Sequence, residues 1–316
     1  MHDHYLDLGG AGPSFHLAPA NGFPPEAYQP FAAALAPQLR VLGYRPRPLW
    51  PEGGPPDGQT WRDLAADMLA DLERVVDGPV IGAGHSLGGI MTLYCAIQRP
   101  DLFRGVALLE PTIMALQLMP LIWAARRLGL EDRSPIARGA ARRRERFASV
   151  EEARARYQSR SIFADFTPAA LEGYLEGGLR PDPDGGVQLA WPRAWEAHIF
   201  AQVPVDTWDA LRRLRVPLLI VRASRSDTLL PGPWAELKRR LPHARLVELA
   251  GSHMLPMERP ELLAETVLEW ISTEDGGRRT EDGGRRTEDG GRRTVRTDDR
   301  RLPPVNCRLR TDACRL

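Results

Sequence analysis

The sequence predicts an α/β protein with a mostly parallel central sheet flanked by helices. Short apolar runs of strand length alternate along the chain with segments of helical periodicity, which is typical of strands joined by helical crossovers. One of these runs, Val80–Ala83, breaks into a glycine-rich turn and continues at once into a helical segment. With 316 residues, 43% of them hydrophobic, the chain is long enough for a sizeable core.

The elements of this core are expected in a regular order. Seven apolar runs are predicted to be strands: Tyr5–Leu8, Phe15–Ala18, Leu39–Tyr44, Val80–Ala83, Gly105–Leu109, Pro217–Arg222 and Arg245–Leu249. Five segments are predicted to be helices: Pro25–Ala36, Thr60–Val76, Leu87–Gln98, Trp234–Leu241 and Pro260–Ile271.

The segment 112–209 interrupts this order. It contains helical stretches, many aromatic residues and a run of arginines at 142–146. Because glutamates interleave with the arginines, we interpret that run as a solvated helix face. An insertion of this size between two core strands is expected to form a helical lid over one end of the sheet. The core would then comprise residues 1–111 and 210–272.

A low-complexity tail follows the core. Thr-Glu-Asp-Gly-Gly-Arg-Arg occurs three times in tandem from Thr273. Each repeat lacks an apolar residue whose burial would offset the cost of ordering the backbone. We therefore predict that residues 273–316 are disordered and lie outside the fold.

Composition and charge restrict the class of protein. The formal net charge of +1 gives no overall electrostatic reason to expect nucleic acid as a partner. No apolar run approaches the roughly 20 residues of a membrane span, and the first residues lack the pattern of a signal peptide. The three cysteines form no disulfide framework. We therefore expect a cytoplasmic protein without a membrane span; its oligomeric state is not indicated.

Gly84-His85-Ser86-Leu87-Gly88 is the first candidate site. A strand, this Gly-x-Ser-x-Gly pattern and a helix follow one another directly. In a nucleophile elbow the serine sits on a strained strand-to-helix turn, and small flanking residues let neighbouring backbone approach closely. Ser86 is therefore the predicted nucleophile.

A serine hydroxyl needs a base, and the base needs a group to orient it. His253 follows the last expected strand, so we predict that it is the base. Asp227, in the loop after the Pro217–Arg222 strand, is the preferred acid because the chain order is then Ser, Asp, His. Glu110 directly follows the Gly105–Leu109 strand and is the alternative acid.

An oxyanion hole needs backbone N–H groups aimed at the charge that develops on the attacked carbonyl. Leu87 directly follows the nucleophile at a helix N-terminus, where the dipole also favours an anion. The second predicted donor is the N–H of Phe23, in the loop Asn21-Gly22-Phe23-Pro24.

Together these motifs resemble those of lid-bearing proteins with the α/β-hydrolase fold. The resemblance covers Tyr5 to Ser272 and rests on Gly-His-Ser-Leu-Gly-Gly, on the loop that carries Asp227, and on Gly-Ser-His-Met-Leu-Pro-Met-Glu-Arg-Pro. Such proteins often have His-Gly-Phe-Pro where this chain has Asn21-Gly22-Phe23-Pro24. That variant resembles a lysophospholipase- or esterase-like subgroup.

The expected function is hydrolysis of a small-molecule carboxylic ester with an apolar acyl or alcohol part through an acyl-enzyme. This reaction requires no metal and no organic cofactor. Ser86 argues against dehalogenases and epoxide hydrolases of this fold, which use an aspartate nucleophile. A carbon–carbon bond hydrolase, a thioesterase, an amidase and a cofactor-free haloperoxidase all keep the serine and stay open as alternatives. A ligand-binding protein without hydrolytic activity is the alternative from another class.

Overall fold

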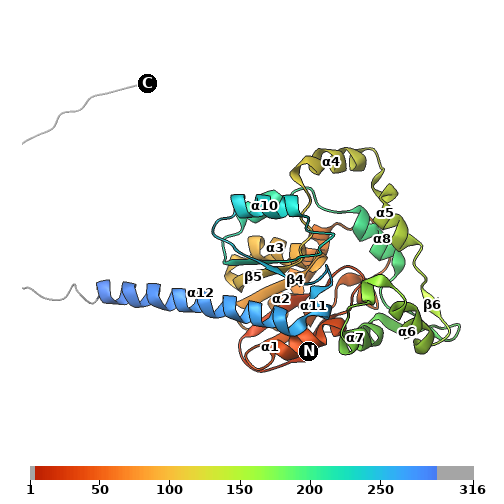
Figure 1. The fold of residues 1–316 in the computed structure, drawn as a ribbon, viewed down its shortest axis with the longest axis horizontal. Helices are drawn as coiled ribbons and strands as arrows, with labels where there is room; N and C mark the ends of the chain where they lie inside the picture. Colours follow the sequence, from red (N-terminus) through yellow and green to blue (C-terminus); the bar gives the residue numbers. More distant parts are fainter. Residues whose placement is uncertain (1–3, 290–316) are drawn as a thin grey trace, which may run out of the picture. The chain divides into compact units, whose positions relative to one another are not determined.

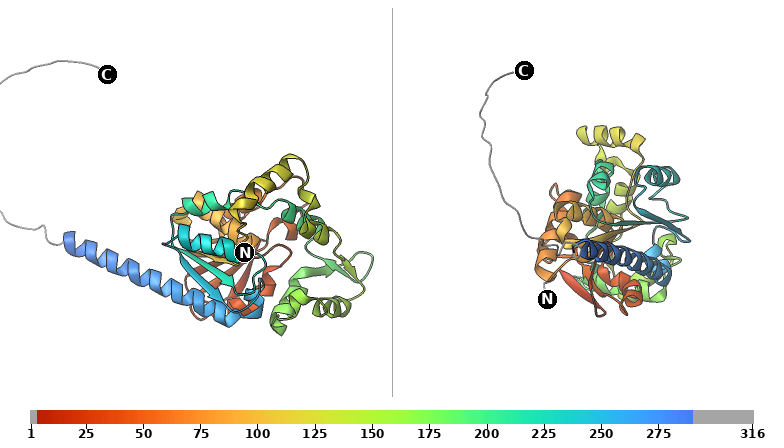
Figure 2. Two further views of the ribbon diagram at one scale, coloured as in Figure 1. Left: turned by 45° about the horizontal axis from the view of Figure 1, so that its top comes forward. Right: turned by 90° about the vertical axis from the view of Figure 1, so that its left-hand side faces the viewer.

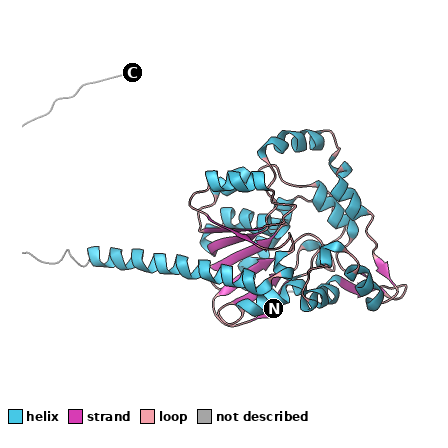
Figure 3. Ribbon diagram, in the orientation of Figure 1, coloured by secondary structure: helices cyan, strands magenta, loops and turns pink. Residues whose placement is uncertain are grey.

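The computed structural model describes residues 4–289, with side chains to Glu274. Its sheet confirms the predicted α/β architecture (Figures 1 and 3). Along the sheet the strands are β1 (Tyr5–Gly9), β3 (Arg40–Tyr44), β2 (Ser14–Ala18), β4 (Val80–His85), β5 (Phe103–Leu109), β9 (Leu218–Ala223) and β10 (Arg245–Leu249). Only β1 is antiparallel to its neighbour, and the other neighbouring strands pair in parallel.

The two faces of the sheet bury separate apolar cores. Along β5, Ala107 and Leu109 belong to one core, whereas Val106 and Leu108 belong to the other, as the alternation of side chains along a strand requires. The first core also takes residues from α1 (Gln29–Leu35), α11 (Leu255–Glu258) and α12 (Pro260–Asp289). The second core takes residues from α2 (Trp61–Val75), α3 (Leu87–Gln98) and α10 (Pro231–Arg240). Helices thus cover both faces, as predicted.

The segment 112–209, which we call the inserted segment, lies between β5 and β9 and is coloured yellow to green in Figures 1 and 2. Its longer helices are α4 (Met119–Arg127), α5 (Pro135–Ala141), α6 (Val150–Gln158), α7 (Pro168–Gly178), α8 (Arg193–Ala201) and α9 (Thr207–Arg213). The sequence did not indicate its small antiparallel sheet of β6 (Arg146–Phe147), β8 (Val187–Leu189) and β7 (Leu179–Pro181). Strands of two or three residues are too short to produce a periodic pattern.

The C-terminal helix is longer than predicted. Residues up to Thr273 form one compact unit, and the described residues after it fall in a second. The helix α12 nevertheless runs to Asp289, through repeats for which we predicted disorder. Extending a helix that already exists avoids the cost of nucleation, whereas the two glycines of each repeat disfavour helical backbone. The remainder of the predicted tail, 290–316, lies outside the described residues. No described helix combines the length and apolarity needed to cross a membrane.

We expect Gly88→Ala to destabilise the fold. A Cβ at Gly88 would lie 2.2 Å from the carbonyl oxygen of Ala18, and backbone cannot yield there without displacing β2. We predict a loss of about 3 kcal/mol or more in the free energy of unfolding, measured by urea denaturation. Gly139→Ala is the matched control, because nothing lies within 4 Å of the added Cβ. This control should change stability by less than about 1 kcal/mol. Equal stability of Gly88→Ala and the wild type would contradict the close approach.

Candidate active site

Ser86 occupies the turn between β4 and α3. Its backbone has φ 52° and ψ −112°, a conformation that residues other than glycine rarely adopt. Its N–H donates to the carbonyl of Leu109 at 3.0 Å, which ties the turn to the end of β5. A Cβ at Gly84 would lie 2.2 Å from the backbone of Gly88, so both glycines of the motif are required by close packing. Ser86 is partly exposed, as a residue that meets a substrate must be.

Glu110 is the second strained residue. Among the described residues, Ser86 and Glu110 are the two non-glycine residues with positive φ, and that of Glu110 is 49°. Its N–H donates to the carbonyl of Val221 at 2.8 Å, which anchors the turn to β9. The two strained positions thus directly follow neighbouring parallel strands, at the same edge of the sheet. Strain of this kind persists only where the surrounding structure enforces it, and it is concentrated at functional sites.

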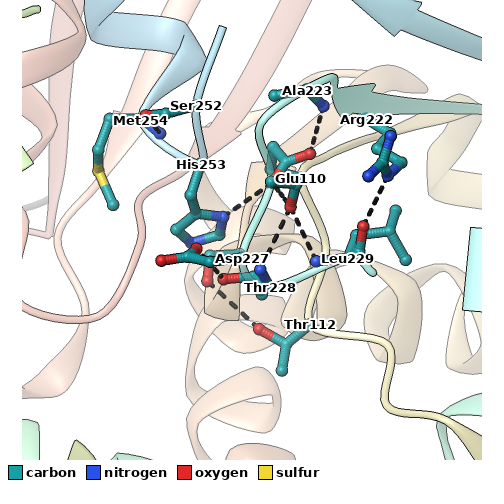
Figure 4. A network of polar contacts seen from close by, with 12 residues as sticks. Glu110, Thr112, Arg222, Ala223, Asp227, Thr228, Leu229, Ser252, His253 and Met254 are labelled. Atoms are coloured by element: carbon teal, nitrogen blue, oxygen red, sulfur yellow. Dashed lines mark hydrogen bonds and ion pairs between the residues drawn. The ribbon is translucent and has the colours of Figure 1, made fainter. Parts of the chain in front are cut away.

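The carboxylate of Glu110 is fully buried and accepts three hydrogen bonds (Figure 4). His253 Nδ1 lies 3.0 Å from Oε2, so an Nδ1–H donates to this oxygen. The Ser226 hydroxyl also donates to Oε2, at 2.5 Å, and the N–H of Ala223 donates to Oε1 at 2.5 Å. Because Nδ1 carries the proton in this arrangement, Nε2 of a neutral His253 is free to accept one.

Asp227, the acid preferred from the sequence, makes no hydrogen bond or ion pair with His253 in the described part of the chain. Its side chain is exposed and accepts a hydrogen bond from the Thr228 hydroxyl at 3.2 Å. The structure therefore favours Glu110, predicted as the alternative, because its carboxylate is the one hydrogen-bonded to His253. The physical reason is the direction of the loop after β9. Ser226 points inward at Glu110, and Asp227, one residue later, points to solvent.

Ser226 is a site residue that the sequence reasoning missed. Its oxygen accepts from the N–H groups of Thr228 and Leu229, at 3.3 and 2.9 Å. With these contacts occupying its lone pairs, the hydroxyl proton is directed to Glu110. A serine in a turn is a common sequence feature, so no signal in the chain distinguished this one.

A chain of hydrogen bonds connects the elbow to two other loops. The N–H of Ala20 donates to the Tyr28 hydroxyl at 2.8 Å, and that hydroxyl donates to His85 Nδ1 at 2.7 Å. His85 Nε2–H donates to the carbonyl of His253 at 2.8 Å. Burial, together with the nearby ring of His253, lowers the pKa of His85 well below its ordinary value. A neutral His85 has one donor and one acceptor nitrogen, as this chain requires.

The two predicted oxyanion donors differ in their present partners. Leu87 is fully buried, and its N–H has no acceptor among the described residues, as expected for the first residue of a helix. The N–H of Phe23 instead donates to the carbonyl of Ala20 at 3.1 Å and closes a turn through Gly22, whose φ is 80°. For Phe23 to bind an oxyanion, this N–H must be shared or released.

The Ser86 hydroxyl has a partner that was not predicted. Its Oγ lies 3.3 Å from the hydroxyl oxygen of Thr112, and the described structure has no hydrogen bond between Ser86 and His253. Catalytic hydrogen bonds are often long or absent before substrate binds. Among the described residues, no three or more His, Cys, Asp or Glu side chains are grouped to hold a metal ion.

Comparisons with known proteins agree with the fold. The model of a family described as the alpha/beta hydrolase family matches residues 9–266. A protein named lipase LipV from Mycobacterium tuberculosis is 29% identical over 211 residues, which cover 63% of this chain and 71% of that protein.

Many solved structures are similar in fold, including the following two. The structure of E-2-(acetamidomethylene)succinate hydrolase has a TM-score of 0.70 and 20% identity, and the match covers 85% of this chain and 98% of that one. A thermophilic esterase from Thermogutta terrifontis has a TM-score of 0.60 and 19% identity, with 85% and 93% covered.

The contacts of Glu110 predict unequal effects of removing the two candidate acids. In Glu110→Gln an amide N–H can face His253 Nδ1, which favours the wrong tautomer of the ring. We expect this variant to cleave p-nitrophenyl acetate roughly 10³- to 10⁴-fold more slowly. Asp227→Asn should change the rate by no more than about twofold, as for other exposed substitutions. If Asp227→Asn lost more of the cleavage rate than Glu110→Gln, Asp227 would be the acid instead.

Proposed function

Because the chain belongs to the alpha/beta hydrolase family, we propose that it is a serine hydrolase that cleaves carboxylic esters with an apolar portion. The observation that carries this proposal is the hydrogen bond between His253 and buried Glu110 beside the strained turn of Ser86. The similarity to a protein named as a lipase supports an ester as the substrate. The structures similar in fold support the architecture alone.

In the proposed reaction, Ser86 Oγ attacks the ester carbonyl while His253 Nε2 takes its proton. Glu110 keeps the proton of His253 on Nδ1 and stabilises the imidazolium that forms. The N–H of Leu87 donates to the oxyanion of the tetrahedral intermediate, and the alcohol leaves with the proton held by His253. Water then attacks the acyl-enzyme with the same histidine as base, which releases the acid and restores Ser86.

The first step requires a change at Ser86. Its hydroxyl now contacts Thr112, so rotation about the Cα–Cβ bond has to bring Oγ to His253. Thr112 lies two residues after Glu110, and both follow β5 directly. In this proposal the Thr112 hydroxyl holds Ser86 in a resting position until substrate arrives.

Aromatic side chains beside the second oxyanion loop support an apolar portion of the substrate. The ring of Phe23 lies 5.1 Å from that of Tyr174, and 6.3 Å from those of Phe163 and Phe166. Tyr174, Phe163 and Phe166 belong to the inserted segment, so this segment and the loop after β2 share one apolar cluster. Apolar and aromatic side chains next to a few polar groups are typical of small-molecule sites.

The nucleophile can be tested by covalent labelling. A fluorophosphonate probe should label the wild-type protein, because it reacts with a serine hydroxyl that a base activates. Ser86→Ala should not be labelled, whereas Ser224→Ala, which removes an exposed serine, should be labelled like the wild type. Mass spectrometry of the labelled peptide identifies the site. Persistent labelling of Ser86→Ala would remove Ser86 from the proposed mechanism.

The substrate class can be tested with a series of p-nitrophenyl esters of increasing acyl length. If the apolar portion contributes binding energy, kcat/KM should rise with each added methylene by up to about fourfold, equivalent to about 0.8 kcal/mol, until the site is filled. Matched thioesters and anilides run beside the esters measure the preference for the leaving group. A faster reaction of the thioesters would favour the thioesterase alternative, and binding without turnover would favour a ligand-binding protein.

A further inference from the structure

The helix α4 presents apolar side chains to solvent. It has no buried residue, and in Figure 1 it lies at the margin of the inserted segment. Leu121 is 66% exposed, Trp123 57% and Leu128 70%. We call Leu118, Leu121, Trp123, Leu128 and Ile136, all exposed, the α4 surface. Leaving such residues in water has a free-energy cost, and a cluster of them usually marks an interaction site.

The concentration of these residues in one segment is unusual. The other exposed large hydrophobic residues among those described are Ile162, Leu230 and Leu262, which are far apart in sequence. Single exposed apolar residues are normal on a protein surface and need no explanation. Five within 19 positions, from 118 to 136, do need one.

Unpaired positive charge accompanies the α4 surface. Arg127, Arg133, Arg138 and Arg142 are exposed, and none has an ion-pair partner among the described residues. Further along the chain, by contrast, Arg144 pairs with Glu152, and Arg146 pairs with Asp182 and Asp184. Between residues 118 and 142 there are five arginines and two acids, although the whole chain has a net charge of +1. The overall balance therefore conceals a local excess of positive charge.

Exposed apolar side chains beside unpaired arginines restrict the kind of partner that can bind the α4 surface. A second copy of the chain would bring two sets of unpaired arginines together, which repel one another. Nucleic acid would match the arginines but would leave Leu121 and Leu128 without a partner. A lipid–water interface matches both features, because apolar side chains enter the acyl region while arginines meet the phosphate headgroups. Tryptophan is also enriched at that boundary.

We propose that the α4 surface docks the protein on the surface of an anionic lipid assembly. Leu121 and Leu128, which are seven positions apart and so lie on one side of α4, enter the acyl region, and the four arginines bind lipid phosphates. The chain leads from Thr112, which contacts Ser86, to Leu118 in six residues, so docking would place a lipid surface close in sequence to the proposed nucleophile. Docking itself does not depend on the proposed hydrolysis.

The test uses full-length protein and phospholipid vesicles. We expect the wild type to sediment with vesicles rich in phosphatidylglycerol, to bind pure phosphatidylcholine weakly, and to be released by high salt. Leu121→Ser combined with Leu128→Ser should weaken binding by at least about tenfold, since two apolar side chains on the lipid-facing side of α4 are lost. Ile162→Ser, at an exposed isoleucine outside the α4 surface, is the matched control and should bind like the wild type.

A second set of variants tests the charge. Gln in place of Arg127, Arg133 and Arg138 should reduce binding to anionic vesicles and flatten its dependence on salt. All variants should hydrolyse a soluble ester at the wild-type rate, so failure of docking and failure of the proposed activity are distinguishable. Undiminished binding of the Leu121/Leu128 variant, equal binding to neutral vesicles, or a dimer in solution that the same variant abolishes would each overturn the proposal.

Discussion

The buried carboxylate of Glu110 is the constraint on which the site depends. A fully buried acid is costly unless its oxygens are hydrogen-bonded, and here β9, the loop after it and His253 provide the donors. Removing any donor leaves part of the carboxylate without a partner in a medium that cannot replace it. The same contacts therefore stabilise the edge of the sheet and fix the ring of His253. Structure and proposed chemistry depend on one side chain.

This edge is also where the backbone is strained. Ser86 directly follows β4 and Glu110 directly follows β5, and each adopts a positive φ that costs on the order of 1–3 kcal/mol. The N–H of each residue donates a hydrogen bond to the neighbouring strand: that of Ser86 to the carbonyl of Leu109, and that of Glu110 to the carbonyl of Val221. Tyr28 and His85 add a second link, from the loop after β2 to the loop that carries His253. The site is thus assembled from strand ends whose relative positions the parallel sheet determines.

The sequence was sufficient for the sheet and for the serine turn, because long periodic runs and a Gly-x-Ser-x-Gly pattern depend on local structure. It was insufficient to predict which carboxylate is hydrogen-bonded to His253. Glu110 and Asp227 both follow strands, and the choice between them depends on the positive φ of Glu110 and on Ser226 pointing inward. Neither feature produces a recognisable pattern in the nearby sequence. The hydrogen bond between Tyr28 and His85 joins residues 57 positions apart, so no sequence spacing predicts it.

The hydrogen bond between His253 and Glu110 can be observed directly by proton NMR of protein labelled with ¹⁵N-histidine. A proton on Nδ1 that is shared with a buried carboxylate resonates far downfield and exchanges slowly with water. We predict such a signal for His253 in the wild type and in Asp227→Asn, and its loss in Glu110→Gln. A signal that persists in Glu110→Gln and disappears in Asp227→Asn would contradict the assignment of Glu110 as the group that orients His253.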